Sequence, residues 1–186
     1  MSIAFKEWAL VCDAIGRGQQ SIILRKGGIA EGRAGFAFQH ADFFLFPTLF
    51  HEQLASTKLP PETAMPEAAP DRIEIRYCIR VEWTALIDDL AVAQKLADFH
   101  IWRDEVIAER FGYGKWNGLN LAFIRAYRLA EPCVLENQPA FGGCRSWVEL
   151  PDVFDVASEP ALNLEAHHAR EKSLKKILDP IPRPVG

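Results

Sequence analysis

The stretch that decides the fold reads Ile73-Glu74-Ile75-Arg76-Tyr77-Cys78-Ile79-Arg80-Val81-Glu82-Trp83. Apolar residues occupy every second position, and charged residues or a cysteine fill the positions between them. Successive side chains of a strand point to opposite faces, so this alternation predicts a strand with one buried and one solvated face. Such strands are typical of antiparallel sheets. We therefore expect a half-buried antiparallel strand over residues 73–83.

The segment of residues 6–27 contains two apolar runs around a glycine-bounded turn. Residues 6–15 precede Gly16-Arg17-Gly18, and residues 21–25 follow at once. Two such runs around a glycine-containing turn predict a β-hairpin. A helix beginning near Lys6 is the alternative, because the first residues of the run are compatible with a helix. The shortness of the run and its end at glycine favour the strand.

The remaining elements follow from the same kinds of pattern. We expect buried strands at residues 36–38 and 43–46, ended by Pro47, and a short helix around residues 49–54. Residues 88–111 are predicted to be mainly helical, and residues 119–129 to form a central strand that Pro132 ends. A strand over residues 146–150 and a last helix from about Pro160 to Leu178 complete the list.

These elements predict a single strand-rich α+β domain with a curved mixed or antiparallel sheet and flanking helices. A barrel like the PUA and ASCH folds is a fold-level interpretation of the many short strands. We expect the domain to span residues 1–157, a C-terminal helix over residues 158–179 to pack on it or extend from it, and residues 180–186 to form a tail. A chain of 186 residues can bury about 70% of its unfolded surface, so it needs no metal or disulfide to fold.

The composition excludes several classes of protein. The chain is 49% hydrophobic and 25% charged, with a formal net charge of −4, so it lacks the overall basic excess of nonspecific nucleic-acid binders. No apolar run approaches the ~20 residues of a membrane span. The cysteines lack the spacing of a zinc knuckle or redox pair, and the first residues lack the pattern of a secretory signal. We expect a cytoplasmic protein with reduced thiols, no metal or other cofactor, and no membrane association.

Several stretches together resemble the Domain of Unknown Function 1802 family. They are Lys6-Glu7-Trp8-Ala9, Leu24-Arg25-Lys26-Gly27-Gly28-Ile29, Phe44-Leu45-Phe46-Pro47-Thr48 with His51, His100-Ile101-Trp102, Arg110-Phe111-Gly112-Tyr113, Arg125-Ala126-Tyr127-Arg128-Leu129 and Gly142 through Leu150. They span roughly residues 5–150 and are specific only as a set. The resemblance implies a small bacterial or archaeal cytosolic protein. It implies no activity, because the family is named for lacking one.

Two loops have the composition of ligand contacts. In Arg25-Lys26-Gly27-Gly28, backbone N–H groups and two cations are able to hold an anion, although the sequence is no Walker motif and also fits a hairpin exit. The loop at Lys115 and Trp116 places a lysine beside an aromatic ring, which suits stacking on a base. With further basic and histidine side chains, the candidate binding residues are Arg25, Lys26, His40, His51, Lys115, Trp116, Arg125 and Arg145.

Catalytic and metal sites have weaker support in the sequence. The histidines lack the tight spacing of metal ligands, and Cys144, after two glycines, fits an accessible thiol or one packed beside Trp147. Asp71 and Glu74 resemble an acidic nuclease pair, but only two residues separate them, so both would lie on one strand. Ion pairs on a solvated face are the simpler interpretation of these charges.

Three hypotheses about function follow. The first is a non-enzymatic module that binds a nucleic acid or nucleotide, which requires the candidate residues to converge on one cleft. The second is an enzyme that acts on a phosphorylated or nucleotide substrate through a histidine or Cys144. The third is an assembly or regulatory protein that forms a homo-oligomer or binds a protein partner through its C-terminal helix, which requires an apolar patch there.

Overall fold

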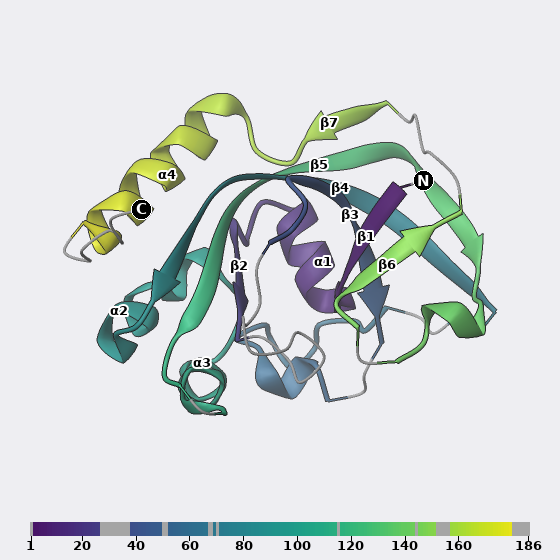
Figure 1. Cartoon of the computed structure of the whole chain (residues 1–186). Helices are drawn as coiled ribbons and strands as arrows, with labels where there is room; N and C mark the ends of the chain where they lie inside the picture. Colours follow the sequence, from purple (N-terminus) through teal and green to yellow (C-terminus); the bar gives the residue numbers. More distant parts are fainter. Residues whose placement is uncertain are drawn as a thin grey trace.

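The computed structural model describes residues 2–26, 38–49, 52–66, 69, 71–114, 116–143, 145–151 and 157–179. Its framework is one seven-stranded sheet that curves over a central helix (Figure 1). The strands are Ser2–Trp8 (β1), Ile22–Arg25 (β2), Asp42–Thr48 (β3), Arg72–Ile87 (β4), Leu119–Glu136 (β5), Trp147–Leu150 (β6) and Ser158–Pro160 (β7). The helices are Ala9–Gly16 (α1), Leu90–Lys95 (α2), Asp104–Gly112 (α3) and Leu164–Leu178 (α4), with 3-10 turns at Leu54–Ser56 (η2), Ala97–Phe99 (η3) and Pro139–Phe141 (η4).

The sheet is mixed and open. Its strands lie in the order β2-β5-β4-β3-β1-β6, and β7 pairs with β5 outside this path. β1 and β3 are parallel, whereas the other pairs are antiparallel. The predicted α+β class, a curved mixed sheet with flanking helices, is confirmed. The described strands do not close into a barrel, because β2 and β6 form the two ends of the path.

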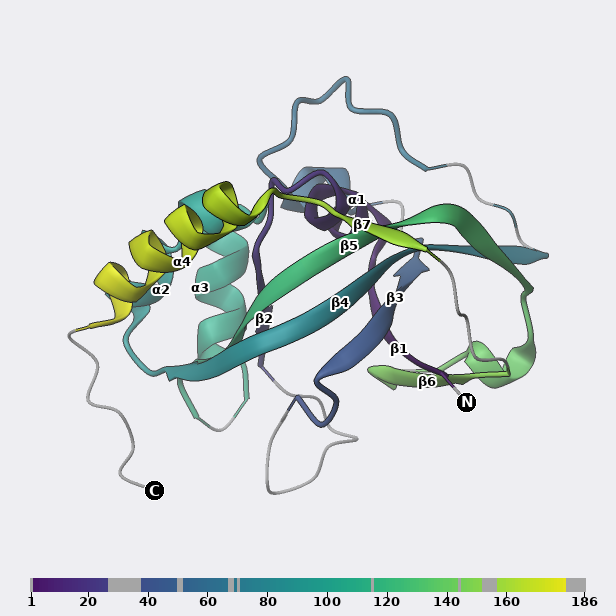
Figure 2. The same ribbon diagram turned by 90° about the horizontal axis from the view of Figure 1, so that it is seen from above.

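The two longest strands, β4 and β5, form the backbone of the sheet. Seen from above, they cross the whole molecule side by side (Figure 2), with α2, α3 and α4 gathered at one end. The strand predicted over residues 73–83 is confirmed inside β4, which is longer. Pro132 does not end β5 as expected. It lies where the β4 register is interrupted, between the pairs of Ile75 and Tyr77, so its missing N–H breaks no bond to β4.

The hairpin predicted for the N-terminal segment is wrong. Residues 2–8 form β1, and the rest of the first run, from Ala9, is the helix α1. The second run is the strand β2, but it pairs with β5 and not with β1. Every residue of α1 except Asp13 is buried, so the helix has no polar face whose period would reveal it. The turn predicted at Gly16-Arg17-Gly18 is confirmed, since α1 ends at Gly16 and Gly18 takes a positive φ of 72°.

The other elements agree with prediction more closely. The helical segment of residues 88–111 is two helices, α2 and α3, and the strand of residues 146–150 is confirmed as β6. β3 continues through Pro47 to Thr48, and the 3-10 turn η2 overlaps the short helix expected around residues 49–54 only at Leu54. α4 begins at Leu164, because the Asn163 side chain accepts a hydrogen bond from the Ala166 N–H at 2.8 Å. The three-residue, fully exposed β7 was not predicted, since it has no apolar pattern.

The described buried residues form two apolar cores. The larger surrounds α1 and includes Phe5, Trp102 and Phe123, whereas the smaller includes Phe46 and Phe141. α4 covers the end of the larger core through His167 and Leu174, and Leu164 is its one largely exposed large apolar residue among those described. This helix therefore offers no broad apolar patch. None of the described helices is long and apolar enough to span a membrane.

Candidate functional site: a cleft beside the central helix

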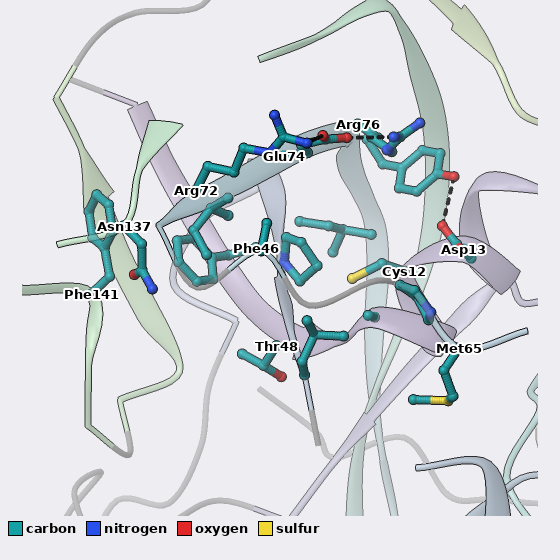
Figure 3. Close-up of a pocket in the computed structure, with 18 of the residues that line it drawn as sticks. Cys12, Asp13, Phe46, Thr48, Met65, Arg72, Glu74, Arg76, Asn137 and Phe141 are labelled. Carbon is teal, nitrogen blue, oxygen red and sulfur yellow. Dashed lines mark hydrogen bonds and ion pairs between the residues drawn. The ribbon is translucent and has the colours of Figure 1, made fainter. Parts of the chain in front are cut away.

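A cleft of about 1310 Å³ lies between one side of α1, the end of β3 and the beginning of β4. The segment around Met65 and the turn of residues 137–142 form its other walls (Figure 3). The cleft therefore joins segments that are distant in sequence. Its position follows from the fold, because the parallel pairing of β1 and β3 brings the start of α1 beside the end of β3.

The floor of the cleft is apolar. The Phe46 and Phe141 rings pack edge to face, with centroids 5.5 Å apart, and both side chains are buried. Leu45, Met65 and Cys12 extend this surface towards α1. Burial and the neighbouring Glu7 and Asp13 charges raise the pKa of the Cys12 thiol well above its ordinary value, so it packs as a neutral group.

A tyrosine and an aspartate form the polar centre of the α1 wall. The Tyr77 hydroxyl donates to Asp13 Oδ1 at 3.0 Å (Figure 3). Burial, followed by the Asp13 charge and hydrogen bond, raises the pKa of Tyr77 to about 12, so the phenol remains a donor. Gly16 is required here, because a Cβ at that position would lie 2.0 Å from the Tyr77 ring.

Arginines on β4 and α1 line the edge of the cleft. Arg76 Nη2 lies 2.5 Å from Glu74 Oε2, and Arg72 Nη2 lies 3.8 Å from Glu74 Oε1, so one carboxylate holds both guanidinium groups (Figure 3). Arg17, just after α1, is exposed and forms no ion pair or side-chain hydrogen bond with the described residues. Arg72 and Arg76 are more than half exposed, so a ligand can reach them.

The charges of the described lining residues balance. Three arginines face the three carboxylates of Asp13, Asp71 and Glu74, and the amides of Asn137 and Gln138 add neutral donors and acceptors. The cleft is therefore no simple anion site. It offers guanidinium groups at its edge, hydrogen-bonding groups of both kinds on its walls and an apolar floor.

Three of the sequence-predicted residues gather at the end of β2 instead. Arg25 Nη2 donates to the Lys6 carbonyl at 2.6 Å and lies 3.3 Å from Glu7 Oε2. Lys26 Nζ donates to the carbonyl groups of residues 111, 116 and 118, and lies 4.1 Å from the centroid of the Trp116 ring. Lys26 thus fixes the loop after α3 and has few donors left for a ligand.

The other predicted residues are dispersed. His40 packs edge to face on Trp147, with ring centroids 4.8 Å apart, Arg125 lies on β5, and the exposed Arg145 donates to the Ala140 carbonyl at 3.3 Å. None of the described candidates lines the cleft. His51 and Lys115, together with Cys144, lie outside the described residues. The convergence that the first hypothesis required is therefore limited to Arg25, Lys26 and Trp116.

Packing and hydrogen bonds within the fold account for His100, His167, Cys78 and Cys133. His100 Nδ1 accepts a hydrogen bond from the Trp102 N–H at 3.1 Å, and burial with the Lys58 and Arg110 charges lowers the pKa of His100 to about 3. His167 stacks on Phe123 with ring centroids 4.8 Å apart. Burial also raises the pKa of Cys78 and Cys133. Within the described ranges, no three histidine, cysteine or acidic side chains group as metal ligands.

Sequence reasoning missed the residues of the cleft for identifiable reasons. Asp13 was assigned to a strand, and its place as the one non-buried residue of α1 appears only when the run is treated as a helix. Glu74 and Arg76 were interpreted as an ion-paired solvated face. Their ion pair exists, but it stands at the edge of a cleft that depends on residues 137–142, more than sixty positions away.

Comparison with known proteins gives a family and a set of structural neighbours. Residues 4–173 match the family described as "Domain of unknown function (DUF1802)". The structure is similar to the crystal structure of ASCH from Zymomonas mobilis, at 10% identity and a TM-score of 0.47, over 93% of this chain and 94% of that one. A serine-to-alanine mutant of that protein matches at 9% identity and a TM-score of 0.48, over 93% and 95% of the two chains. No match to a curated protein is found.

Proposed function

The chain belongs to the DUF1802 family, whose description names no activity, and we propose from its geometry that it binds a short single-stranded nucleic acid or a nucleotide in the α1–β4 cleft. The observation that carries the proposal is the meeting, in one cleft, of accessible arginines with an apolar aromatic floor. Arginine recognises phosphate through its planar pair of donors, and apolar surfaces receive bases.

The size of the cleft favours a ligand longer than one nucleotide. Pockets for drug-sized ligands have volumes of roughly 300–1,000 Å³, and the 1310 Å³ of this cleft exceeds that range. The three arginines lie at two places in the fold, since Arg72 and Arg76 are on β4 and Arg17 follows α1. A ligand with several phosphates along its length suits this distribution.

The balance of charge favours recognition of bases beside phosphates. A carboxylate accepts hydrogen bonds from the N–H groups of a base edge, and an amide donates and accepts. Asp13 has acceptor capacity beyond its bond to Tyr77, and Asn137 and Gln138 stand on the opposite wall. A ligand of phosphate alone would gain little from these groups.

The test is fluorescence anisotropy with labelled single-stranded RNA and DNA oligonucleotides of 4 to 10 residues, beside mononucleotides as competitors. The control variant is Arg80→Gln, since Arg80 is on the same strand and equally exposed but pairs with Asp42 outside the cleft. Arg76→Gln should weaken binding about 10-fold, the effect of one charge-assisted contact, whereas Arg80→Gln should not. Equal effects of the two substitutions, or no binding by the unmodified protein, would refute the proposal.

Salt dependence supplies an independent check. For a single strand, the logarithm of the binding constant falls linearly with the logarithm of the salt concentration, with a slope of about −0.7 for each phosphate that the protein neutralises. Three arginines therefore predict a slope of about −2. A slope much steeper than this would require a basic surface elsewhere on the protein.

A further inference from the structure

A second group of charged side chains lies away from the cleft, on the ends of β1 and β2 and on α3, and Figure 1 shows the end of β2 beside α3. Arg25 at the end of β2 and Arg110 in α3 meet Glu7, Trp8 and Trp102. We call these five residues the arginine cluster. None of them lines the cleft, so an inference about them does not rest on the proposed function.

Among the described residues, aromatic rings contact the Arg110 side chain and no acceptor does. Its guanidinium carbon lies 3.8 Å from the centroid of the Trp102 ring and 5.5 Å from that of Trp8. No carbonyl or carboxylate of the described residues is within hydrogen-bond or ion-pair distance of its side chain. Burial lowers the pKa of Arg110 to about 10, which shows how poorly its charge is solvated.

Arg25 is only partly satisfied. One nitrogen, Nη2, donates to the Lys6 carbonyl and contacts Glu7, and the guanidinium lies 4.5 Å from the centroid of the Phe5 ring. Its Nε is buried and has no hydrogen-bond partner among the described residues. An arginine that keeps donors unused at this degree of burial loses the energy of charge-assisted hydrogen bonds.

The cluster has two cations and one anion. Glu7 is 4% exposed and accepts a hydrogen bond from the Trp8 N–H at 2.9 Å, so part of its capacity is already used. It attracts Arg110 as well as Arg25, while the two arginines repel each other, and Glu109, outside the cluster, adds only a smaller attraction to Arg110. A buried excess of one positive charge is unfavourable unless another anion compensates it.

We propose that Arg25 and Arg110 form an anion-binding site that takes a phosphate group. Arg25 keeps 25% of its side chain exposed and Arg110 is not fully buried, which leaves an approach for a solvent anion on the Arg25 side. The contact with the face of the Trp102 ring restrains the Arg110 guanidinium, whose paired N–H groups can bind two oxygens of one phosphate. The phosphate is either free in solution or the terminal group of a nucleotide or nucleic acid, and the experiment separates these sources.

The experiment follows the side-chain Nε–Hε signals of Arg25 and Arg110 by NMR in the whole ¹⁵N-labelled protein. Sodium phosphate is titrated at constant ionic strength, with chloride as the balancing anion. The expected result is a saturable shift of both signals, while the Arg80 signal, from an exposed pair with Asp42, stays unchanged. No shift with either tens of millimolar phosphate or a 5′-phosphorylated oligonucleotide, or the same shift with chloride, would overturn the proposal.

Variants and a second ligand complete the test. Arg110→Lys keeps the positive charge but removes the planar guanidinium with its paired N–H donors, so phosphate affinity should fall about 10-fold. Arg80→Lys should leave that affinity unchanged. An Arg110→Lys protein that is folded and binds phosphate as well as the unmodified one would contradict the assignment. An oligonucleotide with a 5′-phosphate is compared with one lacking it. A shift with inorganic phosphate alone identifies the free ion, and a shift that requires the 5′-phosphate identifies a nucleotide terminus.

Discussion

The cleft and the arginine cluster lie on two sides of the chain where β1 passes into α1, and they use arginine in opposite ways. In the cleft, Arg72 and Arg76 are more than half exposed and share the carboxylate of Glu74. In the arginine cluster, Arg25 and Arg110 lie against aromatic rings, and the nearly buried Glu7 pairs with Arg25 and attracts Arg110 from beyond ion-pair distance. The same residue type therefore contributes little to stability in one region and is bound into the core in the other.

This difference predicts that substitutions separate into two classes. Changes in the arginine cluster should lower the free energy of unfolding, because they open the larger core. Changes at the cleft edge should leave that free energy nearly unchanged and alter binding alone.

Trp102→Ala should have the largest effect on stability. Trp102 is 1% exposed and packs edge to face on Trp8, with ring centroids 4.7 Å apart. The Arg110 guanidinium lies over its ring. Loss of such a ring costs about 3–5 kcal/mol, which urea denaturation measures. Trp116→Ala is the matched control, since Trp116 is 39% exposed, and it should cost less than about 1 kcal/mol. Similar losses of unfolding free energy in the two variants would contradict the special role of the arginine cluster in stability.

The pH dependence of stability should report His100. Its pKa is about 3 in the folded chain and about 6.5 when unfolded, so between these values the unfolded state binds more protons. Stability should therefore fall as pH drops through 6.5, with a loss of about 2 kcal/mol between pH 7 and pH 5. Urea titrations at the two pH values measure it.

The variant His100→Asn isolates this contribution. An asparagine oxygen can accept the Trp102 N–H that His100 Nδ1 accepts, but it does not titrate. The variant should lose most of the pH dependence, whereas His168→Asn, at an exposed position, should keep it. An unchanged dependence in His100→Asn would show that His100 is not the group responsible.

Gly16→Ala should affect both the stability and the cleft. The added Cβ would lie 2.0 Å from the Tyr77 ring, so the ring must move and its bond to Asp13 is lost. We expect a loss of roughly 1–2 kcal/mol, in the lower part of the range for overpacking, since the half-buried ring has the open cleft beside it. Gly112→Ala is the control, because its Cβ would meet nothing within 4 Å. Equal oligonucleotide affinity in Gly16→Ala and the unmodified protein would show that the α1 wall is not used.

Arg76→Gln should have the smallest effect on stability. The side chain of Arg76 is 53% exposed, and its pair with Glu74 lies at the surface, so the free energy of unfolding should change by less than about 0.5 kcal/mol. Denaturation of this variant beside Arg80→Gln measures the difference. A loss above 1 kcal/mol would show that the cleft edge, like the arginine cluster, supports the core.

The sequence predicted the sheet better than the site, for physical reasons. β4 was recognisable because its alternation comes from one solvated and one buried face, a property local to the strand. α1 was not, because a helix buried on nearly every side has no polar period. Arg25, Lys26 and Trp116 do converge, but Lys26 binds carbonyl groups of the chain itself. Asp13 and Arg76 lie in one cleft only because segments that are distant in the sequence pack side by side, which no local sequence pattern predicts.

Hydrogen exchange with and without a bound single-stranded oligonucleotide tests the central claim most directly. The account predicts slower exchange in residues 9–17, 71–77 and 137–142, which surround the cleft, with no change in residues 104–112 of α3. Protection confined to α3 and the end of β2, with none around the cleft, would place the nucleic acid on the arginine cluster and contradict the proposed function.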